Sequence, residues 1–281
     1  MNKLKPLPEE WSGLLNNEQK EAIENINGPL LIIAGAGSGK TRVLTYRYAH
    51  LIKTYGINFE NVLAITFTNK AANEMKDRIS DLLNLELSPK WISTFHSLCV
   101  KMLRIHGHLI GFNNNFTIYD QSDSTKLVRN CMRDSDIDTK QYSPKRIQAH
   151  ISSLKNQRIL PGEAVEFAQS FFDVKVAEIY SSYQKKLMLA NSMDFDDLLI
   201  KAVELLETSE KSLNYWSSKF QYIMIDEYQD TNMVQYRLVE LLASKHKNIC
   251  VVGDSDQSIY AFRGADIRNI EEFESDFKDA K

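Results

Sequence analysis

The chain has 281 residues, of which 43% are hydrophobic and 25% charged, a composition typical of a folded protein with one large or two modest cores. Its 34 basic and 37 acidic residues give a net charge of −3, so any binding to nucleic acid has to come from a local patch. Three cysteines without CxxC spacing disfavour a disulfide framework or zinc site, and no apolar run approaches the about 20 residues that span a bilayer, so we expect a cytoplasmic protein with no membrane partner.

Five short apolar runs rich in β-branched residues are the expected strands. In chain order they are Leu30–Ala34, Val62–Thr66, Trp91–Thr94, Tyr222–Ile225 and Ile249–Val252. Helical spacing follows the first two, at Lys40–Lys53 and Lys70–Leu83. Apolar strands that alternate with helices are typical of a parallel sheet covered on both faces, so the sequence predicts an α/β fold.

Between the third and fourth of these runs the pattern changes to helical signals almost exclusively. The expected helices are Asp123–Met132, Pro144–Leu154, Pro161–Ala190 with breaks, and Phe195–Leu206. We therefore expect an α/β domain, residues 1–110 and 193–281, that is interrupted by an all-helical insertion at residues 111–192.

Part of this insertion, from Thr139 to Gly162, has five basic residues and no acidic one. They are Lys140, Lys145, Arg146, Lys155 and Arg158. Taken alone, such a stretch is more typical of a solvated helix face than of a nucleic-acid contact, and both interpretations stay open.

The segment AGAGSGKT lies directly after the first expected strand and opens a helix, which is the context of a phosphate-binding loop. Its glycines let backbone N–H groups close around phosphate oxygens, Lys40 would reach the β- and γ-phosphates, and the Thr41 hydroxyl would bind Mg²⁺. The general pattern has glycine where Ala34 stands, and a chance glycine-rich turn is the alternative. The residues expected to bind nucleotide here are Ala34, Gly35, Ala36, Gly37, Ser38, Gly39, Lys40 and Thr41.

An acidic pair, Asp226 and Glu227, follows the fourth expected strand. Side chains at the carboxyl end of a parallel strand face the ligand crevice. Asp226 would hold Mg²⁺ through water, and Glu227 would take a proton from the attacking water, so both are candidate catalytic residues with Lys40. The alternative is a solvated strand end.

Six segments in order resemble motifs of the superfamily 1A DNA helicases of the UvrD/Rep/PcrA type. They are Leu15–Ile23 (Q motif), Thr66–Met75 (motif Ia), Ser93–Leu98 (motif Ib), Asp194–Leu199 (the element before motif II), Ile225–Asn232 (motif II) and Val251–Ala265 (motif III). The resemblance runs from about Leu14 to the end of the chain. Two positions depart from the family pattern, Ser255 where an acidic residue is usual and Phe262 where tryptophan is frequent.

The resemblance implies the amino-terminal half of an ATP-dependent 3′–5′ helicase that moves along single-stranded DNA in the bacterial nucleoid. The implied fold is a RecA-like P-loop NTPase domain interrupted by a helical accessory domain, with ATP and Mg²⁺ as cofactors. Its implied partners are single-stranded and partly duplex DNA and a second RecA-like domain of the same protein. This chain stops before that domain, at a charged segment that we expect to be an artificial boundary, so we expect a monomer that binds Mg·ATP and DNA weakly with little turnover.

The resemblance also assigns roles to single residues. Gln19 would read the adenine base, Gln257 would contact the γ-phosphate or attacking water as a further catalytic residue, and Arg42 would neutralise phosphate charge unless it is merely solvated. Aromatic side chains would stack on bases and their neighbours would hold phosphates. The expected DNA contacts are Thr66, Phe67, Thr68, Asn69, Thr94, His96, Tyr260, Phe262 and Arg263.

Bland alternatives remain for several of these. The aromatic residues could belong to the core, and His96 could be a hydrogen-bonded histidine at a helix start. Two further functions also stay open: a non-catalytic module that binds nucleotide or single strands, and the motor of a helicase that carries a nuclease domain.

Overall fold

The computed structural model describes residues 4–86, 89–254, 273 and 275–281. Its contacts divide the chain into two compact units. The α/β unit comprises Met1–Leu98, Glu210–Thr231 and Val239–Lys281, and the helical unit comprises Cys99–Ser209 and Asn232–Leu238. Within the described ranges, no helix combines the length and the hydropathy needed to cross a membrane.

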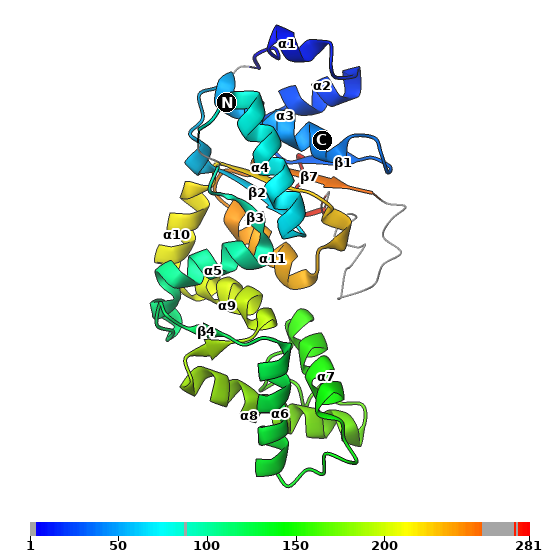
Figure 1. Cartoon of the computed structure of the whole chain (residues 1–281), viewed down its shortest axis with the longest axis vertical. Helices are drawn as coiled ribbons and strands as arrows, with labels where there is room; N and C mark the ends of the chain where they lie inside the picture. The colour runs from blue at the N-terminus through cyan, green and yellow to red at the C-terminus, as the bar shows by residue number, and fades with distance from the viewer. Residues whose placement is uncertain (1–3, 87–88, 255–272, 274) are drawn as a thin grey trace. The chain divides into compact units, whose positions relative to one another are not determined.

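A five-stranded sheet in the order β1-β7-β6-β2-β3 forms the centre of the α/β unit (Figure 1). All four neighbouring pairs of strands are parallel, and β7 lies between β1 and β6. The central α/β fold is therefore confirmed, and each expected strand ends within one residue of its predicted bounds. The strands are β1 (Leu30–Ile33), β2 (Val62–Thr66), β3 (Ile92–Thr94), β6 (Tyr222–Ile225) and β7 (Ile249–Gly253).

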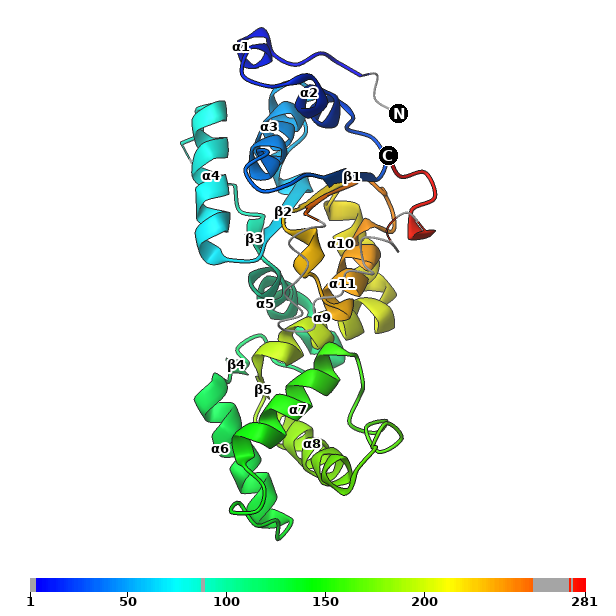
Figure 2. The ribbon, with the colours of Figure 1, turned by 90° about the vertical axis from the view of Figure 1, so that its right-hand side faces the viewer.

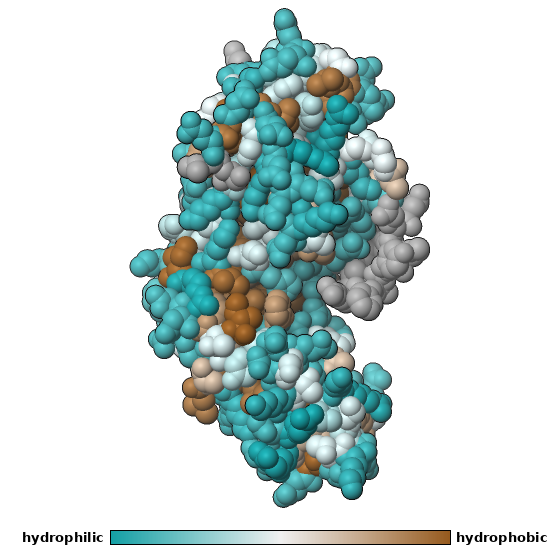
Figure 3. Space-filling view, viewed as in Figure 1, coloured by the Kyte–Doolittle hydropathy of each residue, from teal (hydrophilic) through white to brown (hydrophobic). Residues whose placement is uncertain are grey.

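Helices cover both faces of this sheet. Figures 1 and 2 show α2, α3 and α4 on one side and α10 on the other, so the central strands are buried on both faces. Only three side chains of α4 are fully buried, and Figure 3 shows hydrophilic residues over the side of α4 that faces the viewer. The helices are α1 (Glu9–Ser12), α2 (Asn17–Glu24), α3 (Lys40–Lys53), α4 (Asn69–Leu83) and α10 (Glu210–Lys219).

Local capping fixes where these helices begin. Asn16 and Gln19 form a reciprocal capping box at the start of α2, and the Thr68 hydroxyl accepts a hydrogen bond from the Ala71 N–H at the start of α4. α4 ends at Asn84, which adopts the left-handed conformation typical of a helix terminus.

The helical unit packs α6, α7 and α8 around a core that includes Val128, Ile147, Ile151, Val176 and Leu187. The expected helix from Pro161 begins only at Phe171, where the Ser170 hydroxyl caps the helix by accepting a hydrogen bond from the Asp173 N–H. A parallel pairing of two short strands, β4 with β5, joins the helices of this unit. Its elements are η2 (Gly107–Ile110), β4 (Thr117–Ile118), α6 (Gln121–Asp134), α7 (Pro144–Asn156), α8 (Phe171–Leu189), β5 (Ser192–Met193) and α9 (Phe195–Thr208).

The remaining elements are α5 (Phe95–His106) and α11 (Met233–Ala243), which have residues in both units, and the short helices η1 (Phe59–Asn61) and η3 (Tyr228–Asp230).

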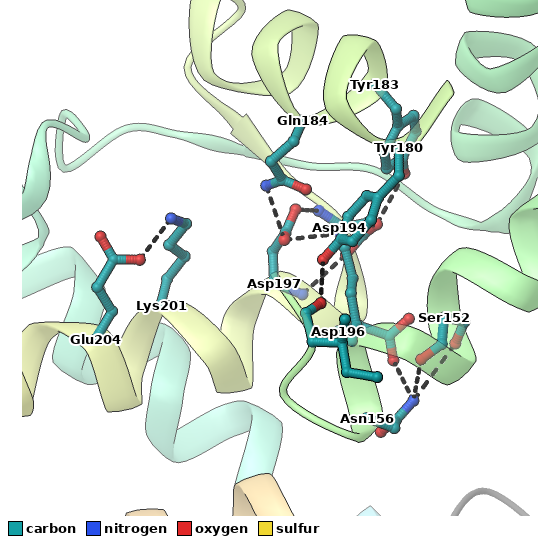
Figure 4. Close-up of polar contacts among 12 residues, drawn as sticks. Ser152, Asn156, Tyr180, Tyr183, Gln184, Asp194, Asp196, Asp197, Lys201 and Glu204 are labelled. Atoms are coloured by element: carbon teal, nitrogen blue, oxygen red, sulfur yellow. Dashed lines mark hydrogen bonds and ion pairs between the residues drawn. The ribbon is translucent and has the colours of Figure 1, made fainter. Parts of the chain in front are cut away.

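A buried polar network lies inside the helical unit (Figure 4). The Lys155 amine is fully buried and donates to Asp194 and Asp197, at 2.7 Å each, while the Tyr183 hydroxyl donates to Asp194 at 2.8 Å. Burial alone would lower the pKa of Lys155, but the two carboxylates outweigh it and raise that pKa. Asp194 and Asp197 also form the capping box of α9, so the same pair starts a helix and neutralises a lysine.

This network takes Lys155 out of both interpretations of the basic stretch, the solvated helix face and the nucleic-acid contact. Lys155 faces inward because its charge is neutralised by Asp194 and Asp197, and Arg158 pairs with Glu207 at 2.9 Å. Only the earlier part of the stretch, which includes the exposed Lys140 and Lys145, presents basic groups without these partners.

Candidate nucleotide-binding site

The loop between β1 and α3 has the conformation of a phosphate cradle. Gly37 and Gly39 adopt φ values of 76° and 89°, which residues other than glycine rarely adopt. A Cβ at Gly39 would lie 3.0 Å from the Gln19 side-chain nitrogen, so a larger residue there would displace the Gln19 amide. Gly35 through Ser38 are exposed at the amino terminus of α3, where backbone N–H groups and the helix dipole favour an anion.

Lys40 lies at the start of α3 and is nearly buried. Its Nζ donates to the carbonyl of Ala34, at 3.1 Å, and to Oδ2 of Asp254, at 2.9 Å. Asp254 follows β7, the strand that pairs with β1, and this strand order brings the two residues together. Asp254 is not among the expected site residues. Its place directly after a buried strand is the signal that could have indicated it.

The acidic pair after β6 meets the same loop. The Thr41 hydroxyl donates to Oδ2 of Asp226 at 2.8 Å. Burial, together with the charge of Glu227, raises the pKa of Asp226, and the hydrogen bond from Thr41 opposes this. The structure thus brings Thr41 against Asp226, with Lys40 and Glu227 next to them in the chain.

Glu227 adopts a left-handed backbone conformation, φ 51°, which is uncommon for a residue with a side chain. Its carboxylate accepts a 2.7 Å hydrogen bond from Nε2 of Gln229, a buried residue that the sequence analysis did not single out. Oε1 of Gln229 accepts a 3.0 Å hydrogen bond from the backbone N–H of Asp254. Gln229 therefore connects Glu227 to the end of β7.

Two further expected nucleotide contacts lie beside the loop. Gln19 donates from Nε2 to the Ser38 carbonyl, at 3.0 Å, and accepts from the Asn16 N–H through Oε1. Its side chain therefore joins the start of α2 to the phosphate loop. Arg42 is exposed in the first turn of α3, and its guanidinium lies 5.6 Å from the centre of the Tyr46 ring.

The expected DNA contacts in the described ranges lie where β2 and β3 end. Thr66 and Thr94 are neighbours in the register of these strands, and both are buried. Their hydroxyls serve local structure, since Thr66 donates to the Thr68 carbonyl and Thr94 accepts from the Ser97 N–H. The other expected contacts at this edge are half-buried or exposed: Phe67, Thr68, Asn69 and His96. The Phe67 and Phe95 rings form a T-shaped pair whose centroids are 5.8 Å apart. Gln257, Tyr260, Phe262 and Arg263 lie outside the described residues.

The groups around the phosphate loop fit Mg²⁺ and a nucleoside triphosphate. The Thr41 hydroxyl and the Asp226 carboxylate already lie within hydrogen-bond distance, and oxygen donors are what Mg²⁺ prefers. In the described part of the chain, no cluster of three or more His, Cys, Asp or Glu residues is suited to a metal. Mg²⁺ bound to a nucleotide does not need such a cluster, because most of its ligands are waters and phosphate oxygens.

The parallel sheet and the glycine loop between β1 and α3 place this chain in the class of α/β proteins of the P-loop type. A family model for the UvrD/REP helicase N-terminal domain matches residues 15–278, and the chain belongs to that family. It is 50% identical over 267 residues to the ATP-dependent DNA helicase PcrA of Staphylococcus epidermidis, which is 95% of this chain and 37% of the relative. It is equally 50% identical over 266 residues to PcrA of Staphylococcus aureus, 95% of this chain and 36% of the relative. The chain thus spans little more than a third of the length of these relatives.

Proposed function

We propose that this chain is the nucleotide-binding part of an ATP-dependent 3′–5′ DNA helicase. The observation that carries the proposal is the convergence of Lys40 and Thr41 on one side with Asp226 and Glu227 on the other, from segments far apart in the sequence. The identity to two PcrA helicases over 95% of the chain supports the DNA-dependent part.

Each group has a role in the proposed hydrolysis. Lys40 and the loop N–H groups would bind the β- and γ-phosphates, and Gln19 would contact the base. Thr41, and Asp226 through water, would hold Mg²⁺, which supplies positive charge to the phosphate oxygens. Glu227 would accept the proton of the attacking water, with Gln257 beside the γ-phosphate. Arg42 would add positive charge at the loop.

We also propose that the residues at the ends of β2 and β3 contact single-stranded DNA, together with segments beyond β7. The proposed contacts are Thr66, Phe67, Thr68, Asn69, Thr94, His96, Tyr260, Phe262 and Arg263. We assign residues 111–192 to the accessory domain and the flanking residues to the motor. A second RecA-like domain would supply an arginine whose loss typically lowers the rate by about 10³–10⁵-fold, so the chain alone would turn over slowly as a monomer.

Titration with a fluorescent ATP analogue, with and without Mg²⁺, tests the nucleotide site. We expect Mg²⁺-dependent binding that Lys40→Ala abolishes and that Lys211→Ala, at an exposed lysine of α10, leaves unchanged. Labelled oligonucleotides titrated across salt concentrations test the DNA surface. Binding that is indifferent to Lys40→Ala would reject the proposed site, and DNA-stimulated hydrolysis as fast as that of a complete helicase would reject slow turnover.

A further inference from the structure

The segment Asp194–Leu199, which resembles the element before motif II, has no role in the hydrolysis proposed above. One of its carboxylates, that of Asp196, accepts a 3.2 Å hydrogen bond from Nδ2 of Asn156, the last residue of α7 (Figure 4). The same Nδ2 donates to the Ser152 carbonyl at 2.8 Å. An amide nitrogen has two hydrogens, so these two acceptors fix the orientation of the Asn156 side chain and direct its oxygen away from them.

The oxygen of Asn156 meets the start of α11. It accepts a 2.7 Å hydrogen bond from Nδ2 of Asn232, which is 5% exposed. Asn232 and Gln235 also bond reciprocally, side chain to backbone N–H, as a capping box does. Asn232 and Asn156 both belong to the helical unit, and the chain enters that unit from the α/β unit at the peptide bond between Thr231 and Asn232.

A short run of hydrogen bonds connects Glu227 to this anchored residue. The Asp230 N–H donates to the Glu227 carbonyl at 2.9 Å, and the N–H and hydroxyl of Thr231 both donate to the Tyr228 carbonyl. Glu227 has the left-handed φ of 51°, and such a conformation persists where the surrounding structure holds it. The strand β6 holds the chain before Glu227, and the anchored Asn232 holds it after.

We infer that Asn156 is a positioning residue for the proposed hydrolysis. It anchors Asn232, and through the backbone of η3 it holds the Glu227 carboxylate in place for the attacking water. This inference rests on the proposed role of Glu227 as the base. It also gives the Asp194–Leu199 segment a part in the same reaction, because Asp196 orients the Asn156 amide.

Single-turnover hydrolysis of Mg·ATP and the affinity for a fluorescent ATP analogue, measured on the same variants, test this inference. Asn156→Ala removes the anchor, and we expect the hydrolysis rate to fall by about 10-fold, because a shift of about 1 Å in a reacting group can cost up to about 100-fold. The affinity should change by less than about 2-fold, since the phosphate loop keeps its own contacts.

Gln157→Ala is the matched control. The Gln157 side chain also donates to a carbonyl of the preceding turn, that of Ser153, but it is exposed, and among the described residues it bonds only to Ser153. We expect this variant to keep both the rate and the affinity of the unaltered chain.

Asn232→Ser breaks the same bond from the other end. Serine can still cap α11 but is too short to reach Asn156, so we expect a similar loss of rate. The double variant should be no slower than either single variant, because all three lack the same bond. A melting curve accompanies each variant, and Asn232→Ser carries the test if Asn156→Ala does not fold.

An unchanged rate in Asn156→Ala, an equal loss in Gln157→Ala, a loss of rate that only follows weaker affinity, or losses that add in the double variant would overturn the inference. Glu227→Gln separates this inference from the proposed function. If Glu227→Gln slows hydrolysis and Asn156→Ala does not, only this inference fails. If Glu227→Gln has no effect, or if the unaltered chain hydrolyses no ATP, the proposed function and the inference both fail.

Discussion

Thr41 and Asp226 are 185 positions apart in the chain, yet the hydroxyl of one donates to the carboxylate of the other at 2.8 Å. The strand order explains this contact. β1, which leads to Thr41, and β6, which leads to Asp226, are both neighbours of β7, and in a parallel sheet all three strands end at the same edge. Asp254 at the end of β7 therefore lies between the phosphate loop and the acidic pair.

The Thr41 hydroxyl should matter only when Mg²⁺ is present. We expect Thr41→Ala to weaken nucleotide binding about 10-fold in Mg²⁺, in line with the loss of one interaction with a charged group, and to have little effect in EDTA. Thr41→Ser keeps the hydroxyl and should retain most of the affinity. An equal loss with and without Mg²⁺ would show that Thr41 acts through the loop conformation instead.

Loss of Gln229 should release Glu227 from its buried donor. Gln229→Ala removes the buried oxygen that accepts the Asp254 N–H, so we expect the free energy of unfolding to fall by about 1–3 kcal/mol. Single-turnover hydrolysis should slow more than nucleotide affinity declines, because Glu227 is the proposed base. Urea unfolding and quenched-flow assays measure the two effects, and slower hydrolysis that only follows weaker binding would contradict the positioning role.

The buried lysine of the helical unit should be indispensable for stability. Lys155→Met leaves Asp194 and Asp197 buried without their cation, and we expect a loss of about 3–5 kcal/mol in the free energy of unfolding. Lys145→Ala, an exposed lysine on the same helix, should change it by less than about 0.5 kcal/mol. Denaturant titration compares the two variants. A loss of stability in Lys155→Met as small as that in Lys145→Ala would mean that Asp194 and Asp197 find other partners or take up protons.

His50 should make the chain sensitive to acid. It is fully buried beside Tyr55, and burial lowers its pKa below the ordinary 6.5. The unfolded chain therefore binds a proton on His50 more readily than the folded chain does. The contribution of His50 to the free energy of unfolding is thus fully present above pH 6.5 and is lost as the pH falls below it.

Thermal melts at several pH values test this dependence. His50→Phe keeps a ring against Tyr55 and should reduce the loss of stability on acidification, whereas His108→Gln, at an exposed histidine, should leave it in place. An unchanged pH profile in His50→Phe would assign the acid sensitivity to other groups.

Most of the sheet and the phosphate loop could be predicted because their signals are local. Apolar runs such as Val62–Thr66 and the glycines before Lys40 need no distant partner to be recognised. The pairing of β4 with β5 was missed because a strand of two residues has no periodicity. The inward direction of Lys155 and the bond from the Asp254 N–H to Gln229 were missed because the partners are distant in sequence and are set by the tertiary fold.

The position of β7 also has a consequence for biosynthesis. β1 pairs with no described strand other than β7, which is made more than two hundred residues later. While the nascent chain is still on the ribosome, the first strand and its glycine loop therefore wait with an open edge until Ile249–Gly253 emerge from the exit tunnel. Any chaperone that protects the growing polypeptide would have most reason to cover that edge during this interval.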